Sequence, residues 1–320
     1  MFIFTCILGT SIANAQDLSA IGGDLTSDFI GKNAIQLKAP NVISQERWNL
    51  QASGFGVFHG VFIKKTGLGP NFINSSCGGC HLNNGRGPIG SFERDKRTTM
   101  VIKVSRPRLN ADGSPRNIPG VGDQLLNHSL GKIENVINIR LRWILVNGTY
   151  PDGTTYQLRK PKLKIFIRGE LPRRIVYSLR MSPPLIGMGL LEAISDATLL
   201  NLSDPFDLNN DGISGKLNYV PDVRKGLKTI GRFGFKATQT TVEQQSAAAL
   251  FSDMRISNSL FPSRRSEVEI SDDALFRLAI YQRIGGIPRA RNQNESYCTT
   301  LLNACETGGS SEAVCLAQEQ

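Results

Sequence analysis

The pentapeptide Cys77-Gly78-Gly79-Cys80-His81 constrains this chain more than any other feature of its sequence. Its C-x-x-C-H spacing is the attachment pattern of c-type haem. In that pattern two cysteine sulfurs form thioethers with the haem vinyl groups, and the histidine reaches the iron from the proximal face. The motif therefore predicts covalent haem c, with Cys77 and Cys80 as its anchors and His81 as the proximal ligand.

Two other kinds of site also use closely spaced cysteines. A zinc site would need a second pair of Cys or His ligands, and the remaining candidates in this chain are distant or unpaired. A thioredoxin-like redox pair belongs in a βαβ unit, whereas this motif lies among glycines. Haem c is therefore the favoured interpretation.

The N-terminus resembles an export signal. Residues 2–8 are mostly apolar, and Ala13-Asn14-Ala15 has the small-x-small form of a signal-peptidase site. Residues 1–15 are therefore predicted to be a signal peptide that directs the chain to the periplasm, where this haem is attached. The usual positive charge at the start is missing, so a frayed apolar N-terminus is the alternative. No later segment approaches the roughly 20 apolar residues that span a bilayer, so no membrane span is expected.

Composition excludes several classes of protein and suggests a kind of partner. The chain is 40% hydrophobic and 20% charged, which excludes wholesale disorder, collagen and coiled coil. Lys and Arg exceed Asp and Glu by 37 to 27, a net charge of +10 that favours anionic partners. Basic residues do not interleave with aromatic ones as in nucleic-acid modules. The expected partner is a redox protein or a small electron donor or acceptor, and not nucleic acid.

Periodicity indicates a β-rich segment over residues 98–167. A strand is expected from Thr98 to Val104, and residues 137–145 alternate between apolar and polar side chains. Asn147-Gly148 then predicts a turn, followed by a returning strand that Pro161 interrupts.

The second half of the chain has helical periodicity. Thr241-x-x-Gln244 is a capping box that predicts a helix through about Met254. Ser271 is expected to begin another helix that Gly285 ends. Glycines and a serine should divide the apolar run 185–202 in two.

Short blocks found in order along the chain resemble the bacterial di-haem oxidoreductases, which are also described as peroxidase-like or thiol-oxidoreductase-like proteins. The resemblance covers roughly residues 20 to 290. The blocks are Gly22–Thr26, Gly67–Phe72, Ser76–His81, Asn84–Gly87, Gly122–Leu125, Asp152–Pro161, Gly187–Ile194, Asp211–Gly215, Gly231–Ala237 and Asp253-Met254.

This resemblance implies two haem c sites, a periplasmic location and electron transfer, with peroxidase-like chemistry as an alternative activity. The family would continue beyond Arg291 into a second C-x-x-C-H domain. Here Cys298, Cys305 and Cys315 have no histidine after them. We therefore expect one haem per chain and an impaired peroxidase, and interpret residues 292–320 as an aberrant tail produced by a frameshift, an early stop or an assembly error. Besides an electron-transfer protein and a peroxidase, a basic, non-enzymatic binding module is the third functional class. Its only support is the net charge of +10.

The expected fold is mainly α, a cytochrome-c-like haem core with a β-rich insert, which makes it α+β overall. Residues 16–97 would form an N-terminal segment with the haem motif, in which residues 51–97 hold glycine-rich turns. Residues 98–167 would form the insert, and residues 168–291 the helical part of the cytochrome-c-like domain.

Several residues of this sequence are candidates for the distal ligand of the iron. A methionine thioether would raise the potential for electron transfer, whereas an open position would admit peroxide. Met188 is the first candidate, and core packing is the alternative role for any methionine. The other candidates are Met254, Met181, His128 and His59.

Three further residues are candidates for roles at the haem. Glu192 could move a proton between the oxygens of peroxide, although it could equally be a surface glutamate. Arg86 and Arg232 are flanked by glycines and could pair with the haem propionates.

A possible calcium loop begins at Asp207. Asp207, Asn209 and Asp211 follow the D-x-[DN]-x-[DN]-G pattern, and Ile213 would contribute its backbone carbonyl. Position 12 is Asn218 instead of the usual glutamate, so a plain turn rich in Asx residues is the alternative.

Overall fold

The structure, a computed structural model, describes residues 19–29, 36–88, 99–110, 115–130, 137–167, 174–263 and 268–290. The predicted signal peptide and the predicted tail with its cysteines lie outside these residues. Helix and strand each account for 29% of the described residues. The α+β class is therefore confirmed, but helix does not predominate as expected. In the described part of the chain no helix is both long and apolar enough to cross a membrane.

Six α-helices and twelve strands lie in the described residues. The helices are α1 Gln45–His59, α2 Cys77–Cys80, α3 Met188–Ala193, α4 Asp196–Leu202, α5 Val242–Met254 and α6 Asp272–Arg283. The strands are β1 Thr26–Ser27, β2 Asn71–Phe72, β3 Met100–Leu109, β4 Pro115–Arg116, β5 Gln124–Leu125, β6 His128–Ser129, β7 Ile137–Thr149, β8 Thr155–Ile167, β9 Val176–Met181, β10 Tyr219–Asp222, β11 Leu227–Ile230 and β12 Ile287–Pro288.

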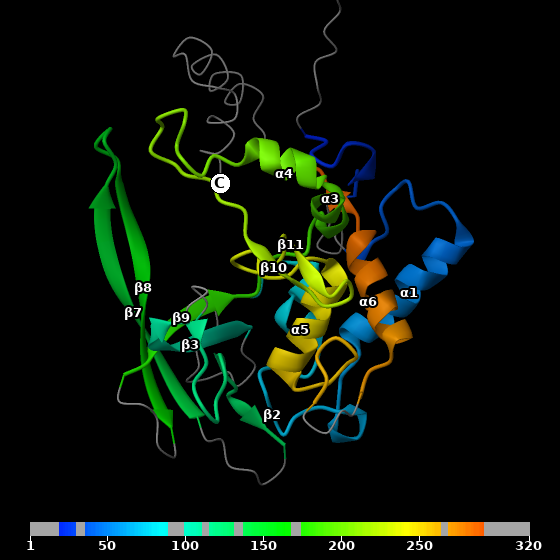
Figure 1. Cartoon of the computed structure of the whole chain (residues 1–320), viewed down its shortest axis with the longest axis horizontal. Helices are drawn as coiled ribbons and strands as arrows, with labels where there is room; N and C mark the ends of the chain where they lie inside the picture. The colour runs from blue at the N-terminus through cyan, green and yellow to red at the C-terminus, as the bar shows by residue number, and fades with distance from the viewer. Residues whose placement is uncertain are drawn as a thin grey trace, which may run out of the picture.

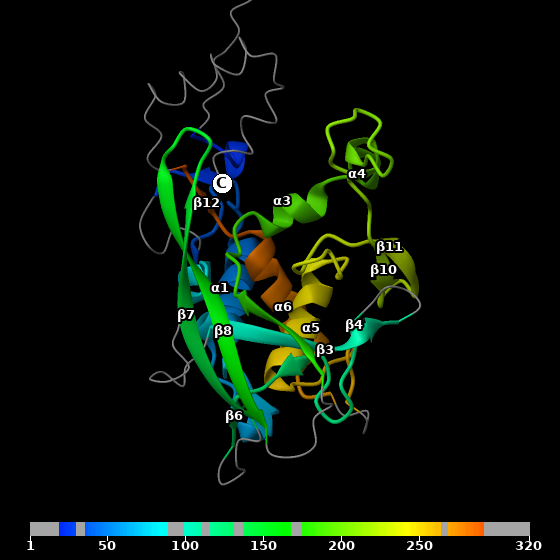
Figure 2. The same cartoon turned by 90° about the vertical axis from the view of Figure 1, so that its left-hand side faces the viewer.

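The longer strands β3, β7, β8 and β9 lie on one side of the molecule and helices α1, α5 and α6 on the other (Figure 1). Helices α1, α5 and α6 pack around a core that includes Phe58, Leu250, Leu278 and Tyr281. On the other side, β3 pairs with β4, β5 and β9. The β7–β8 ribbon lies across this sheet (Figure 2), and the two share a second core. The short strands β1 and β12 pair in parallel and bring the two ends of the described chain together.

The predicted helix boundaries are largely confirmed because their signals are local. The Thr241 side chain accepts a hydrogen bond from the Gln244 backbone at the start of α5, and α5 ends at Met254 as predicted. Ser271 caps α6 in the same way. Ser195 caps α4 and separates it from α3, which divides the apolar run as expected.

One helix and one strand were not foreseen at their observed places. Helix α1 fills part of the segment that was interpreted as glycine-rich turns. The insert also involves β9, which lies beyond residue 167 and pairs with β3 from Met100 to Ser105.

The ribbon forms as predicted, but its turn was misplaced. Asn147 and Gly148 pair with Gln157 and Tyr156 inside the ladder, and the chain reverses over residues 150–154. A Cβ atom on Gly148 would lie 2.3 Å from the Tyr156 ring, so this glycine admits the ring instead of making a turn.

Pro161 does not interrupt the returning strand. It pairs with Trp143 in a continuous ladder from Ile137–Ile167 to Thr149–Thr155. Each strand of a two-stranded ribbon is an edge, where the missing N–H of a proline can face away from the ladder.

Candidate haem site

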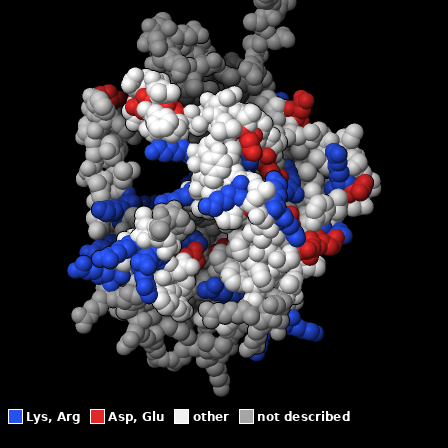
Figure 3. All heavy atoms as spheres, in the orientation of Figure 1, with Lys and Arg blue, Asp and Glu red and all other residues white. Residues whose placement is uncertain are grey.

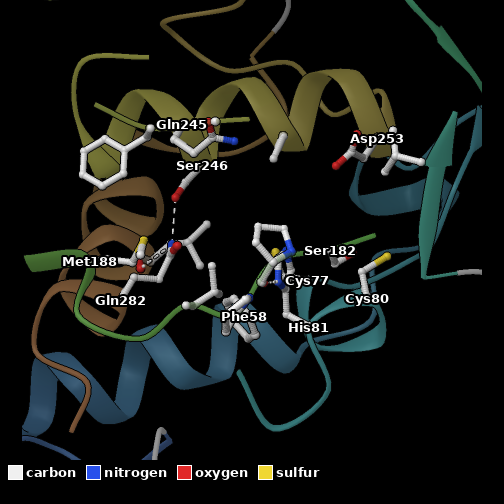
Figure 4. A pocket seen from close by; sticks show the side chains of 18 of the residues that line it. Phe58, Cys77, Cys80, His81, Ser182, Met188, Gln245, Ser246, Asp253 and Gln282 are labelled. Carbon is white, nitrogen blue, oxygen red and sulfur yellow. Dashed lines mark hydrogen bonds between the residues drawn. The ribbon is translucent and has the colours of Figure 1, made fainter. Parts of the chain in front are cut away.

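A cavity of about 320 Å³ lies between helices α1, α5 and α6 and the segment that follows β9 (Figure 4). Apolar side chains such as Phe58, Leu191 and Leu278 form much of its wall. Helix α5 presents Gln245, Ala249 and Asp253 to the cavity, because residues four apart lie on one face of a helix. Cavities of this size and lining are typical of sites for cofactors and small molecules.

The C-x-x-C-H motif forms part of this wall. Cys77, Cys80 and His81 all line the cavity, and the short helix α2 places them there. Ser76 caps this helix by accepting a hydrogen bond from the Gly79 backbone. A Cβ atom on Gly78 would lie 2.3 Å from Nδ1 of His59, so helix α1 can approach the motif only because residue 78 is glycine.

His81 is held by a backbone carbonyl. Its Nδ1 lies 2.8 Å from the carbonyl oxygen of Pro183, in the segment after β9. Histidines that bind metals usually donate their other ring N–H to such an acceptor, which fixes the tautomer and the ring orientation. This contact leaves Nε2 as the nitrogen with a free lone pair. Burial is the main cause that lowers the pKa of His81, which favours the neutral, ligating form.

The two cysteines are reduced and protonated in this environment. Neither forms a disulfide, and burial raises the pKa of each to about 12. A disulfide between them would remove both anchors, so the reduced form is the one that can attach a haem.

The structure brings three of the distal-ligand candidates to the same cavity. Met181, Met188 and Met254 all line it. Met188 lies at the end of the cavity away from Cys80 (Figure 4). His59 lies behind the motif, against Gly78, and His128 stacks on Phe72 at a centroid distance of 5.6 Å.

Two arginines are associated with the cavity, one in its lining and one against a lining residue, and sequence reasoning found only the first. Arg232 lines the cavity and pairs with Asp196 through Nη2, while its Nη1 is buried without a partner among the described residues. Arg180 covers the ring of Phe235, another lining residue, at 4.9 Å, and its Nε is likewise buried without a partner. Arg86 is exposed and does not line the cavity.

Asp253 is a site residue that sequence reasoning missed. Its carboxylate lines the cavity on the same side as Cys80 (Figure 4), and it accepts a hydrogen bond of 2.6 Å from Gln124. Burial raises the pKa of Asp253. The Asp253-Met254 block was noticed only as part of the resemblance, and nothing local in the sequence shows that α5 turns this carboxylate inward.

Glu192 lies outside the cavity wall. Its carboxylate binds the Arg283 guanidinium, with the Nε–Oε2 distance at 2.5 Å. It also accepts a hydrogen bond of 2.8 Å from the Val242 backbone at the start of α5. These contacts join α3, α5 and α6.

The possible calcium loop has its side chains turned to its own backbone. The Asp207 carboxylate accepts a hydrogen bond from the Gly212 N–H, and the Asp211 carboxylate accepts one from the Ile213 N–H. The Asn209 side chain bonds Asp211. Among the described residues no group of three or more Asp, Glu, His or Cys side chains could hold a metal ion. The arrangement is that of a turn rich in Asx residues.

The residues around the cavity fit a haem. Both thioether anchors and an oriented histidine share one wall, and apolar side chains line the interior. Arg232 and Arg180 each have a buried nitrogen that finds no acceptor in the described part of the chain. Haem propionates are acceptors of the required charge.

Comparison with known protein families matches residues 54–292 to the family described as "Di-haem oxidoreductase, putative peroxidase". No curated protein and no solved structure matches the chain. The match covers the haem motif, the ribbon, helices α2, α3, α5 and α6, and the C-terminal part of α1.

Proposed function

This chain belongs to the di-haem oxidoreductase family, and from that premise we propose that it is an exported c-type cytochrome that transfers electrons through one haem c. Cys77 and Cys80 are the thioether anchors and His81 is the proximal ligand. When bound, haem c supplies a one-electron redox centre. Helices α1, α2, α5 and α6 form the cytochrome-c-like core around it.

The observation that carries this proposal is the contact between His81 and Pro183. A histidine whose Nδ1 is taken by a carbonyl at 2.8 Å has its Nε2 free for a metal, and this ring shares a cavity wall with both cysteines. Arg232 and Arg180 would bind the propionates, and the apolar wall would exclude water. Excluding water lowers the reorganisation that accompanies a change of charge.

Haem attachment is tested by expressing the whole chain in cells that have a working cytochrome c maturation system. We expect a band that retains haem stain on a denaturing gel, and one haem per chain by the pyridine haemochrome assay. Replacing Cys77 and Cys80 by Ser should abolish the stain, while Ser214→Ala, a change at an exposed serine outside the helices and strands, serves as a control that keeps it. An unstained wild-type band would refute the proposal.

The export step has its own measurement. Fractionation should place the haem-bearing chain in the periplasm, and N-terminal sequencing of that chain should begin at Gln16. Accumulation of the full-length chain in the cytoplasm would contradict export without bearing on the geometry of the site.

Peroxide reduction is a second candidate function, favoured by the position of Asp253. Its carboxylate lies in the same cavity as His81, and splitting peroxide requires a group that moves a proton between its oxygens. Reduction of one peroxide to two waters consumes two electrons and two protons. A single one-electron centre makes this slow, so we expect reversible one-electron redox behaviour and weak peroxide turnover. Rapid turnover with a reduced donor, lost in Asp253→Asn, would favour the peroxidase.

A further inference from the structure

The outer face of the β7–β8 ribbon carries a regular array of cations. Arg140 pairs directly with Lys164, and Arg142 pairs directly with Lys162. Lys160 follows on the same face, opposite Ile144. These five exposed residues form what we call the basic face, and blue side chains gather over this part of the molecule (Figure 3).

This array opposes the stability of the ribbon. Like charges directly opposite each other in an antiparallel pair are destabilising. Neither strand contains an Asp or Glu. In the described part of the chain no ion pair is formed by any residue of the basic face. The repulsion is therefore left for an external anion to relieve.

The inner face of the ribbon explains why the cations point outward. Ile139, Leu141 and Leu163 are buried against the β3 sheet, and side chains alternate between the two faces of a strand. The register that buries these three residues fixes the basic face on the outside of the molecule.

Aliphatic side chains adjoin the basic face. Ile144 is 45% exposed, Val146 is 41% exposed and Leu158 is 57% exposed, and all three lie on the same side of the ribbon as the cations. A surface that offers both cations and uncovered aliphatic groups matches the usual composition of a protein interface better than that of a phosphate-binding surface.

The aromatic rings of the ribbon are already occupied. Arg140 and Lys164 lie over the Phe166 ring at 5.5 and 5.1 Å, and Arg159 lies over Trp143 at 5.4 Å. Binding of single-stranded nucleic acid relies on rings that are free to stack on bases. The ribbon therefore lacks the stacking surface that such a ligand needs.

We propose that the basic face of the β7–β8 ribbon docks an acidic protein surface, with Ile144, Val146 and Leu158 as its apolar contact. This proposal rests on the proposed function in one respect only, which is the activity of the partner. If the chain transfers electrons, the acidic partner is a redox protein. The charge accelerates association and is screened by salt.

The test measures the binding of defined probes to the purified full chain by fluorescence anisotropy. The probes are a peptide of alternating Glu and Ser, the same peptide with every second Ser replaced by Leu, and oligothymidylate of equal net charge. We expect the Leu-containing peptide to bind most tightly. Anionic phosphatidylglycerol vesicles are the fourth probe and should bind less tightly than the Leu-containing peptide.

Matched variants separate the basic face from general charge. Arg142→Gln with Lys162→Gln should weaken binding of the Leu-containing peptide by about fivefold. Lys64→Gln with Lys65→Gln removes the same charge from an exposed segment on the helical side and should change the affinity less than twofold. Leu158→Ser should abolish the advantage of the Leu-containing peptide.

Thermal stability gives a second readout. The Arg142→Gln, Lys162→Gln variant should melt at the same temperature as the wild type or higher, because it removes a repulsive pair. Equal loss of affinity in both double variants, or tighter binding of oligothymidylate or vesicles, would overturn the proposal. Each variant is compared with the wild type at the same measured haem content. Haem attachment is read from the absorbance and docking from the anisotropy, so the two failures are distinguishable.

Discussion

Nδ1 of His59 occupies the space beside Gly78, where a Cβ atom would approach it to 2.3 Å. His59 belongs to helix α1, whereas Gly78 lies between the two cysteines of the motif. The contact therefore fixes the position of the motif relative to the helical core. Gly78 has no side chain that could contact a haem. It still belongs to the site, because only glycine leaves room for His59 at this position.

Gly78→Ala should destabilise the chain by about 1–3 kcal/mol, because overpacking at a rigid contact forces neighbouring groups to move. Thermal unfolding measures the loss. His59→Ala in the same chain should recover part of it by removing the atom that clashes. Gly56→Ala is the matched control, since its Cβ meets nothing within 4 Å and alanine favours a helix. A stable Gly78→Ala variant would show that α1 and the motif are not in contact.

Arg232→Gln should reduce the fraction of chains that carry haem several-fold. Its Nη1 is buried and lacks a partner among the described residues, so a bound propionate would satisfy it. The ratio of haem absorbance to protein concentration measures the loss. Arg86→Gln is the control, because Arg86 is exposed and lies away from the cavity. Equal losses in the two variants would show that Arg232 does not bind haem.

Tyr281 should make the folded chain less stable at high pH. Burial raises the pKa of Tyr281 from its usual value of 10 to about 12, and its hydroxyl donates to Asn84 at 3.0 Å. Between these two values the folded chain binds more protons than the unfolded chain, so stability falls as pH rises. Denaturant unfolding across this range measures the slope. Tyr281→Phe should flatten it, and an unchanged slope would contradict the prediction.

Sequence reasoning was most successful where a feature is local. The caps at Thr241 and Ser271 depend on a side chain and a backbone N–H three residues later, so the pattern alone locates them. The haem motif is also a local pattern, and the structure places Cys77, Cys80 and His81 in the lining of one cavity. The role of Gly148 was misjudged because the ring of Tyr156, not a turn, requires a glycine there.

The inner wall of the site could not be predicted in this way. Asp253 comes from α5 and lines the cavity, and Arg180 comes from β9 and covers the lining residue Phe235, so only tertiary packing brings them to the site. Their sequence contexts are those of ordinary surface residues. Helix α1 was missed because its two internal glycines and its mixed polar pattern give no clear helical period.

Glu192→Gln should lower stability by about 1–3 kcal/mol and leave redox behaviour unchanged. Its carboxylate binds Arg283 and also accepts the Val242 N–H, so the neutral amide weakens a partly buried pair and the start of α5. Chemical denaturation measures the stability, and voltammetry of the haem-loaded chain measures the potential. Arg283→Gln should give a similar loss, and the double variant should lose less than the sum, because both changes break one pair. If Glu192 instead moves protons at the haem, Glu192→Gln will change peroxide turnover while Arg283→Gln will not.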